Sequence, residues 1–252
     1  MSGTRNLVIV RAGDESLHES WLEPATDRNF ALAVSYYGKE QGRYAATADR
    51  QVEAAGPKWG PLADFIDSHW DWVSQFDYIA LPDDDLAATA SDWNGLFQTM
   101  DELGFDLAQP SLDYQSFWTH QITAQRPAYR ARVTNFVEVM TPTFSRWALE
   151  CCLPTFRMST SGFGLDIVWP TILQQAGREL GIIDEVCVGH TRPFNGSQAV
   201  GPEVDGAQGI YKTLTHPPVI DEMILSQVFG VAFPFDPAVY RAITADTAGH
   251  SG

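Results

Sequence analysis

The sequence predicts an α/β fold, a single domain in which helices cover both faces of a mainly parallel central sheet. Short apolar runs at residues 7–10, 30–37 and 76–81 alternate with segments whose apolar residues recur at helical spacing. Neither an internal repeat nor a flexible linker interrupts this alternation, and 44% of the 252 residues are hydrophobic. We therefore expect one large core and one domain over residues 1–252.

Three strands and one helix are expected in the first third of the chain. The apolar runs at 7–10 and 30–37 have the continuous hydrophobicity of strands buried on both faces. Residues 39–58 are polar and predict a loop over the edge of the sheet. Pro61 can open a helix, which then leads to the third strand at 76–81.

The middle of the chain predicts a helix and a short strand. Ser91 or Asp92 can cap the start of the helix, and Gly104 can end it in the left-handed conformation. The strand at 107–109 is expected to stop at Pro110, because proline has no N–H for the sheet ladder. The later elements expected are a strand at 136–140, a helix from Pro142, a helix between the glycine-rich segment 159–166 and Gly181, a strand at 182–188, a loop at 191–216 and a last helix from 219.

The charge balance narrows the class of partner. Asp and Glu total 32 against 16 Lys and Arg, which gives a formal net charge of −16. This balance argues against a nucleic-acid backbone or an anionic membrane surface as the main partner. A phosphorylated substrate remains compatible, because a bound divalent cation supplies positive charge locally.

Cysteine usage and hydropathy predict a soluble cytoplasmic protein. The three cysteines, two of them adjacent, form neither a disulfide framework nor a zinc-binding spacing, so buried thiols in a reducing compartment are expected. The first apolar run is too short for the core of a signal peptide, and none of the apolar runs approaches the length of a membrane span.

Three consecutive carboxylates, Asp83, Asp84 and Asp85, follow the third strand directly after Pro82. Ligands of open α/β sheets bind beyond the carboxyl ends of the strands, so these acids are expected at the edge of a site. In an extended backbone Asp83 and Asp85 point to the same side, where two carboxylates suit Mg²⁺ or Mn²⁺. The structural alternative for a lone D-x-D is a solvated acidic turn.

Further motifs keep a fixed order around this triplet. They are a strand ending at Arg11, Lys58-Trp59 before a helix, D-D-D-L at 83–86, F-V-E-V-M at 136–140 with Pro142 and Phe144-Ser145, and G-F-G-L-D at 162–166 with His190 downstream. This order resembles the GT-A fold of nucleotide-sugar glycosyltransferases. It is most similar to a glycosyltransferase-like plant and bacterial family of unassigned function, with the pattern K-W … D-x-D-L … Q-P-x-L-D … F-V-E-x-M-x-P-x-F-S … G-x-G-L-D … V-x-D … H. The match spans residues 5–195 and includes Q-P-S-L-D at 109–113 and Ile183-Asp184.

The resemblance implies a metal site and a donor site. In such enzymes the D-x-D holds Mn²⁺ or Mg²⁺ against the donor diphosphate, and a downstream histidine completes the metal shell. Matched to this sequence, the implied metal ligands are Asp83, Asp85 and His190. The implied donor-binding residues are Arg11, Asp14, Lys58, Asp83 and Asp84.

The G-F-G-L-D segment also resembles the G-W-G-x-E-D acceptor motif of β-1,4-galactosyltransferases. That likeness implies Asp166 as the base that activates the acceptor. Leu165 stands where that family has Glu, so only one carboxylate of the motif remains, and Glu138 is the second catalytic candidate. The expected acceptor-binding residues are Phe163, Gly164 and Trp118.

The implied function is metal-dependent transfer of a sugar from a nucleoside-diphosphate sugar to a glycan or lipid-linked acceptor, as in polysaccharide biosynthesis. Residues 1–110 would form the donor-nucleotide half, 111–216 the acceptor half, and 217–252 a C-terminal helix and tail. Each of four residues also has a purely structural interpretation. Asp166 could serve only to stabilise the start of its helix, and His190 could be a core residue. Lys58 could be a surface charge, and Glu138 could pair with Arg130 or Arg132.

Two other functions compete with this one. A haloacid-dehalogenase-type phosphatase also places acids after a strand, with the first Asp as nucleophile. That scheme needs the motif at the first strand and a later Asp-Asp pair, and this sequence has neither. A module that binds a nucleotide sugar or glycan without turnover is the non-enzymatic alternative, supported by Leu165 in place of Glu.

Overall fold

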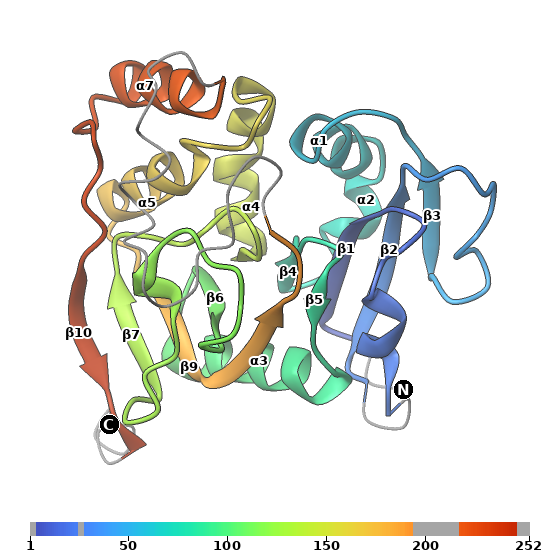
Figure 1. The fold of residues 1–252 in the computed structure, drawn as a ribbon, viewed down its shortest axis with the longest axis horizontal. Helices are drawn as coiled ribbons and strands as arrows, with labels where there is room; N and C mark the ends of the chain where they lie inside the picture. Colours follow the sequence, from blue (N-terminus) through green and yellow to red (C-terminus); the bar gives the residue numbers. More distant parts are fainter. Residues whose placement is uncertain (1–3, 25–27, 194–216, 246–252) are drawn as a thin grey trace.

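A computed structural model describes residues 4–24, 28–193 and 217–245. Over these residues the strands form a ten-stranded sheet that runs from β10 (Val239–Ile243) at one edge to β3 (Arg50–Glu53) at the other (Figure 1). Apolar clusters with helices lie on both faces of the sheet. The predicted α/β fold is therefore confirmed.

The N-terminal half of the sheet is parallel. β1 (Asn6–Ala12) lies between β2 (Phe30–Tyr36) and β4 (Tyr78–Ala80), and β3 pairs with the outer side of β2. Every residue of β1 is buried, as expected for a central strand covered on both faces. The prediction of a loop over 39–58 is wrong for β3, whose polar sequence R-Q-V-E is the kind that a sheet edge tolerates.

The C-terminal half of the sheet is mixed. β8 (Thr143–Ser145) pairs antiparallel with both β4 and β6 (Leu107–Leu112), and β6 pairs parallel with β9 (Leu180–His190). β7 (Ala131–Thr134) and then β10 follow, both antiparallel to their neighbours, while β5 (Leu86–Ala87) pairs with the end of β9. Because two antiparallel steps separate β4 from β6, the carboxyl ends of β1, β4 and β9 lie at the same edge.

Alternate residues of β1 enter two different cores. Val8 and Val10 pack in the cluster that contains the apolar side of α3, whereas Leu7 and Ile9 pack with α1, α4 and α5. Figure 1 shows α7 beside α5, which it contacts. The helices are α1 (Trp59–Ser68), α2 (Trp70–Val73), α3 (Ala90–Leu103), α4 (Arg146–Cys152), α5 (Leu165–Gln175) and α7 (Pro217–Phe229), with 3₁₀ turns at His18–Leu22, Gln121–Thr123 and Leu153–Met158.

The start of α3 differs from the prediction, and its end agrees with it. Thr89 is the N-cap in place of Ser91 or Asp92. Its hydroxyl accepts from the Asp92 amide at 3.3 Å, and the Asp92 carboxylate accepts from the Thr89 amide at 2.8 Å. This reciprocal pair is a capping box. Gly104 ends the helix with a left-handed φ of 69°.

Two prolines have roles other than those predicted. β6 continues beyond Pro110, and its register against β9 shifts directly after that residue, so the missing N–H falls at an irregularity of the ladder. The residues after Pro142 form β8, and the helix begins later, at Arg146. Ser145 caps this helix, because its hydroxyl accepts a backbone N–H at 3.2 Å.

Residues 136–140 form an irregular segment between β7 and β8, so the predicted strand is wrong. The backbone groups of this segment bond to side chains and to the acidic loop instead of to a strand. The Glu138 amide donates to Gln109 Oε1 at 2.6 Å, and the Met140 carbonyl accepts from the Asp83 amide at 2.8 Å. These hydrogen bonds replace the strand-to-strand hydrogen bonds that the alternation of apolar and polar residues at 136–140 predicts.

The glycine-rich segment 159–166 leads into a helix as predicted, but α5 ends at Gln175. Gly181 does not end a helix, because it lies near the start of β9. A Cβ at Gly181 would lie 2.4 Å from a ring atom of Phe105, so close packing explains this glycine.

The cysteines are Cys151, Cys152 and Cys187, and all three are free thiols, in line with the prediction that no disulfide framework exists. Burial raises the pKa of the Cys152 thiol, so this side chain stays protonated and belongs to the packed core. None of the helices in the described ranges combines the length and apolarity needed to cross a bilayer.

Candidate functional site

A cleft of about 540 Å³ opens at the carboxyl ends of β1, β4 and β9. Open α/β sheets bind their ligands at this edge. Six of the residues predicted for the donor and metal sites line the cleft, namely Arg11, Lys58, Asp83, Asp84, Asp85 and His190, and Asp14 is absent from the lining.

Asp83, Asp85 and His190 form a possible metal site. Each offers one ligand atom, and these atoms lie within 4.8 Å of one another. The pairing of β5 with β9 places Leu86 opposite His190, which holds the acidic loop beside the histidine. Asp85 Oδ1 is buried and, among the described residues, has no hydrogen-bond partner. Two carboxylates and an imidazole with an unpartnered oxygen fit Mn²⁺ or Mg²⁺.

The ring of His190 is oriented by a hydrogen bond between Nδ1 and the Phe117 carbonyl. That bond leaves Nε2 facing Asp85 Oδ2, at 3.3 Å. Burial acts to lower the pKa of His190, but the hydrogen bond and charge of Asp85 outweigh it and raise the pKa to about 9. A cation bound at Nε2 would therefore replace a proton.

Asp84 is not part of this possible metal group and connects three loops. Its Oδ2 accepts from the Gly13 amide at 2.7 Å and from the Tyr37 hydroxyl at 3.4 Å, and Oδ1 lies 3.5 Å from Arg192 Nη1. Burial raises the pKa of Asp84 despite these partners. The middle acid of the triplet thus joins the loop after β1 to the chain after β9.

Arg11 is buried, and its guanidinium is directed at the chain's own oxygens. It donates to Ser35 Oγ at 2.9 Å, to the Ala54 carbonyl at 2.8 Å and to the Gly56 carbonyl at 2.7 Å. Burial lowers the pKa of Arg11. The residue therefore holds the loop between β3 and α1 against the end of β1.

Asp14 holds a turn outside the cleft. Its carboxylate accepts from the Tyr36 hydroxyl and from the Lys39 amide at 3.0 Å. The Tyr36 hydrogen bond and then the Lys39 amide lower the pKa of Asp14. These contacts fix the turn after β2, and donor contact by Asp14 remains a prediction.

Lys58 lies at the start of α1 and donates to three oxygens of the protein. These are Asp83 Oδ1 at 2.7 Å, the Val139 carbonyl at 2.8 Å and the Met140 carbonyl at 3.1 Å. Only 15% of its side chain is exposed, so Lys58 is not a surface charge.

Glu138 is buried and lies within the electrostatic influence of His190 and Asp83. Burial raises its pKa to about 7, and the charges of His190 and Asp83 also act on it. Its Oε2 has no hydrogen-bond partner within the described part of the chain. The alternative pairing with Arg130 or Arg132 is not observed, because Arg130 pairs with Glu102 and Glu185 and Arg132 with Asp184.

Asp166 lies in the first turn of α5, buried beneath α7. Its Oδ1 accepts from the Gly164 amide at 3.2 Å, which is the contact expected of a helix-start acid. Burial, followed by the charges of Glu222 on α7 and of Glu138, raises its pKa well above the usual range. Asp166, Phe163 and Glu222 line a cavity of about 10 Å³, which is too small for a sugar.

The three predicted acceptor-binding residues lie in different surroundings. Phe163 lines the small cavity beneath α7. Gly164 has a left-handed φ of 88°, and a Cβ there would lie 3.0 Å from the backbone of Glu222, so α7 rests on this glycine. Trp118 is buried in the core cluster that contains α3. Their contact with an acceptor remains a prediction.

Two cleft residues, Tyr37 and Arg192, were not singled out from the sequence. Tyr37 follows β2, is 49% exposed, and lies with its ring 5.1 Å from the Arg11 guanidinium carbon. Arg192 donates to the Glu15 carbonyl and lies two residues beyond the predicted ligand His190. The sequence signal that could have found them is their position just after the ends of β2 and β9, where ligands of α/β sheets bind.

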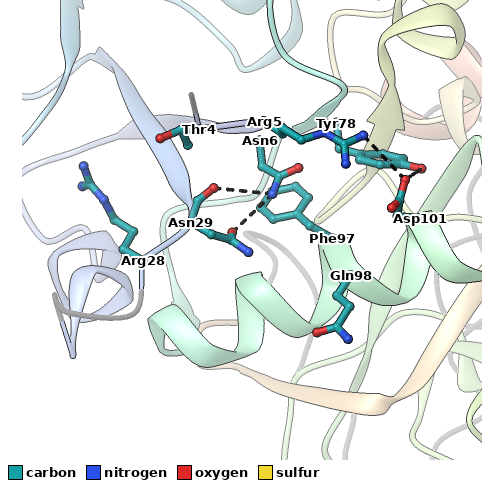
Figure 2. A pocket seen from close by; sticks show the side chains of 9 residues that line it. All are labelled: Thr4, Arg5, Asn6, Arg28, Asn29, Tyr78, Phe97, Gln98 and Asp101. Carbon is teal, nitrogen blue, oxygen red and sulfur yellow. Dashed lines mark hydrogen bonds and ion pairs between the residues drawn. The ribbon is translucent and has the colours of Figure 1, made fainter. Parts of the chain in front are cut away.

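A second cleft, of about 450 Å³, lies at the opposite ends of β1 and β4 (Figure 2). Several of its polar groups are already paired, because Arg5 contacts Asp101 and Asp77, and Asn6 donates to Asn29 at 3.3 Å. Among the described residues, no group that could hold a metal ion lies in this second cleft, and no parallel strand has its carboxyl end there. The cleft at the acidic loop is therefore the candidate site.

The comparisons with known proteins concern structure alone, since no protein-family model and no curated protein matches the sequence. The chain is similar to a crystal structure of GalNAc-T7 with UDP, GalNAc and Mn²⁺, with a TM-score of 0.58 and 9% identity over 88% of this chain and 48% of that one. It is also similar to S. aureus TarS, with a TM-score of 0.50 and 11% identity over 75% of this chain and 37% of that one.

A structure of TarS residues 1–349 is similar too, with a TM-score of 0.50 and 10% identity over 73% of this chain and 59% of that one. This chain spans less than two thirds of each of these structures. All of them are GT-A glycosyltransferases, and at such low identity the likeness concerns the fold. The chain therefore has a GT-A-like, mixed α/β fold.

Proposed function

We propose that the protein is a divalent-metal-dependent glycosyltransferase. It would move a sugar from a nucleoside-diphosphate sugar to a glycan or lipid-linked acceptor. The observation that carries the proposal is the group Asp83, Asp85 and His190 at the carboxyl edge of a GT-A-like sheet. The crystal structure of GalNAc-T7, one of the fold neighbours, contains UDP and Mn²⁺.

Asp83, Asp85 and His190 would hold the cation, with Mn²⁺ favoured by the imidazole beside two carboxylates. When bound, such a cation stabilises the negative charge that grows on a departing diphosphate. It also explains how a chain with a net charge of −16 would accept an anionic donor.

Tyr37 and Arg192 are the exposed cleft groups that we assign to the donor. The Tyr37 ring offers a flat apolar face for a nucleobase. Arg192 is 38% exposed in its side chain and lies 3.5 Å from Asp84, so its guanidinium can exchange this weak contact for a phosphate oxygen.

Glu138 is our preferred general base, and Asp166 is the second candidate. A base near neutral pH needs a pKa near 7 and a free oxygen, and Glu138 has a pKa of about 7 and an unpartnered Oε2. Asp166 is engaged with the Gly164 amide beneath α7, so an acceptor hydroxyl would reach it only after α7 moves.

The decisive experiment is a thermal-shift screen of nucleoside diphosphates and their sugars, with Mn²⁺, with Mg²⁺ and with chelator. Stabilisation that requires the metal, followed by metal-dependent hydrolysis or transfer of the sugar, is the expected result. Metal-dependent binding without turnover would instead support a non-catalytic binding module. Phosphate release from p-nitrophenyl phosphate would support the phosphatase alternative. The cytoplasmic location and the lipid-linked or polysaccharide acceptor rest on the sequence alone.

A further inference from the structure

The ammonium group of Lys58 has no donor left for a ligand. A lysine ammonium carries three N–H donors. The three acceptors around Nζ are Asp83 Oδ1 at 2.7 Å, the Val139 carbonyl at 2.8 Å and the Met140 carbonyl at 3.1 Å. A contact with a donor phosphate would require one of these bonds to break.

The three acceptors belong to two segments that are far apart in the sequence. Asp83 is in the acidic loop after β4, and the two carbonyls belong to the irregular segment that carries Glu138. Lys58 itself comes from a third segment, directly before α1. The same Met140 carbonyl also accepts from the Asp83 amide at 2.8 Å, so Lys58 and the Asp83 backbone share one acceptor.

The ammonium group of Lys58 also lies over an aromatic ring, which further fixes the position of this cation. Its Nζ lies 4.8 Å from the centroid of the Trp59 ring, and that ring is buried in the core against Phe156 and Trp169. Burial lowers the pKa of Lys58, while the charge of Asp83 acts in the opposite direction. A charge that is desolvated in this way is stable only with its partners in place.

We propose that Lys58 is a positioning residue that sets the metal-binding carboxylate of Asp83 and ties it to the Glu138 segment. The inference rests on the proposed function of the metal site. Lys58 orients one oxygen of Asp83, leaving the other oxygen for a cation, and holds the backbone on either side of Met140. Groups that orient metal ligands from behind usually affect metal affinity about 10–100-fold.

The test measures binding of Mn²⁺ alone, without nucleotide, by titration calorimetry or by the electron paramagnetic resonance signal of free Mn²⁺. Lys58→Met removes the ammonium and keeps the length of the stem. We expect it to weaken Mn²⁺ binding by about tenfold or more. Lys39→Ala is the matched control, because Lys39 is an exposed lysine outside the cleft, and it should bind Mn²⁺ like the wild type.

Chemical rescue separates positioning from general damage. Lys58→Ala opens the space of a propylammonium ion, and added propylammonium chloride should restore much of its Mn²⁺ affinity. The filled stem of Lys58→Met should prevent the same rescue. Circular dichroism checks that Lys58→Met is folded. If it is not, Lys58→Ala can be purified in the presence of propylammonium, and its Mn²⁺ affinity can then be compared before and after the propylammonium is removed.

The outcomes distinguish this inference from the proposed function. A wild-type protein that binds no Mn²⁺ overturns the metal-dependent function itself. A wild type that binds Mn²⁺, with folded Lys58 variants that bind it equally well or more tightly, overturns the positioning role alone. Weaker binding of a nucleoside diphosphate with unchanged Mn²⁺ affinity would make Lys58 a phosphate ligand and also overturn the inference.

Discussion

The Nε2 atom of His190 lies 3.3 Å from Oδ2 of Asp85, although Asp85 lies in the loop after β4 and His190 is the last residue of β9. The short pairing of β5 with β9 causes this proximity, because it sets Leu86 opposite His190. A carboxylate and an imidazole become neighbours through backbone hydrogen bonds that do not depend on either side chain. Substitutions of these two residues should therefore change binding more than folding.

The first prediction concerns Asp85. Asp85→Ala removes a buried carboxylate with an unpartnered oxygen, and we expect stabilisation by nucleoside diphosphate plus Mn²⁺ to be lost while the protein stays folded. Thermal shifts with and without chelator measure this effect. Asp71→Ala is the control, because Asp71 is an exposed acid outside the cleft lining. Unchanged metal-dependent stabilisation in Asp85→Ala would contradict the assignment.

The second prediction is a pH dependence of metal affinity. The pKa of His190 in the metal-free protein is about 9, so below pH 9 a proton must leave before a cation binds. The Mn²⁺ dissociation constant should fall about tenfold per pH unit and level off above pH 9. His190→Ala should bind Mn²⁺ weakly and without this slope. A flat profile in the wild type would show that the proton and the cation do not compete.

The same titration affects the stability of the metal-free protein. Because the folded pKa of His190 is raised above the ordinary 6.5, its contribution is fully present below pH 6.5. That contribution should disappear as the pH rises through about 9. Urea unfolding at several pH values in chelator, compared between the wild type and His190→Ala, measures it.

The third prediction distinguishes the two candidate bases. Glu138→Gln should lower turnover by about 10²–10⁴-fold and leave donor affinity intact, because a base acts only as the transition state forms. Asp166→Asn should stay within a few-fold of the wild type, since Asn can also accept from the Gly164 amide. The pKa of Glu138 in the metal-free protein is about 7, and a bound cation would lower it, so in the wild type the rate should rise with pH to a plateau that is reached by about pH 7. The opposite ranking of the two variants would assign the base to Asp166.

The fourth prediction concerns the donor. Arg192→Ala should weaken nucleoside-diphosphate binding, since it removes an exposed guanidinium from the cleft, but should leave binding of Mn²⁺ alone within a few-fold. Titration calorimetry with metal alone and with metal plus nucleotide separates the two effects. Arg157→Ala is a matched control, because that arginine pairs with Asp64 and Asp67 away from the cleft.

The fifth prediction is structural. Arg132 and Asp184 form a two-bond ion pair with both distances 2.8 Å and side-chain exposures of 3% and 0%. Arg132→Met leaves a buried carboxylate without its partner and should lower the free energy of unfolding by about 3–5 kcal/mol. Denaturant unfolding checks this value. A loss below about 1 kcal/mol would mean that the pair behaves like a surface ion pair.

The sequence by itself determined the fold class and the place of the acidic loop. An apolar run such as that of β1 can be read from a few consecutive residues. Its continuous hydrophobicity predicts a strand buried on both faces, without knowledge of the neighbouring strands. The position of Asp83, Asp84 and Asp85 directly after a strand also follows from local order. The rule that parallel strands place their carboxyl ends at one edge then brings His190 to the same site.

The tertiary structure decided what the polar groups do there. Lys58 was expected at a donor phosphate, but it pairs with Asp83 and with two carbonyls of a segment that the alternating pattern F-V-E-V-M predicted as a strand. Asp166 lies beneath α7, which no local pattern reveals. Hydrogen-bond partners of buried polar groups are chosen among residues distant in sequence, because every such group must be satisfied within the folded chain. Spacing therefore predicted which residues would lie at the candidate site, and three-dimensional packing assigned their contacts.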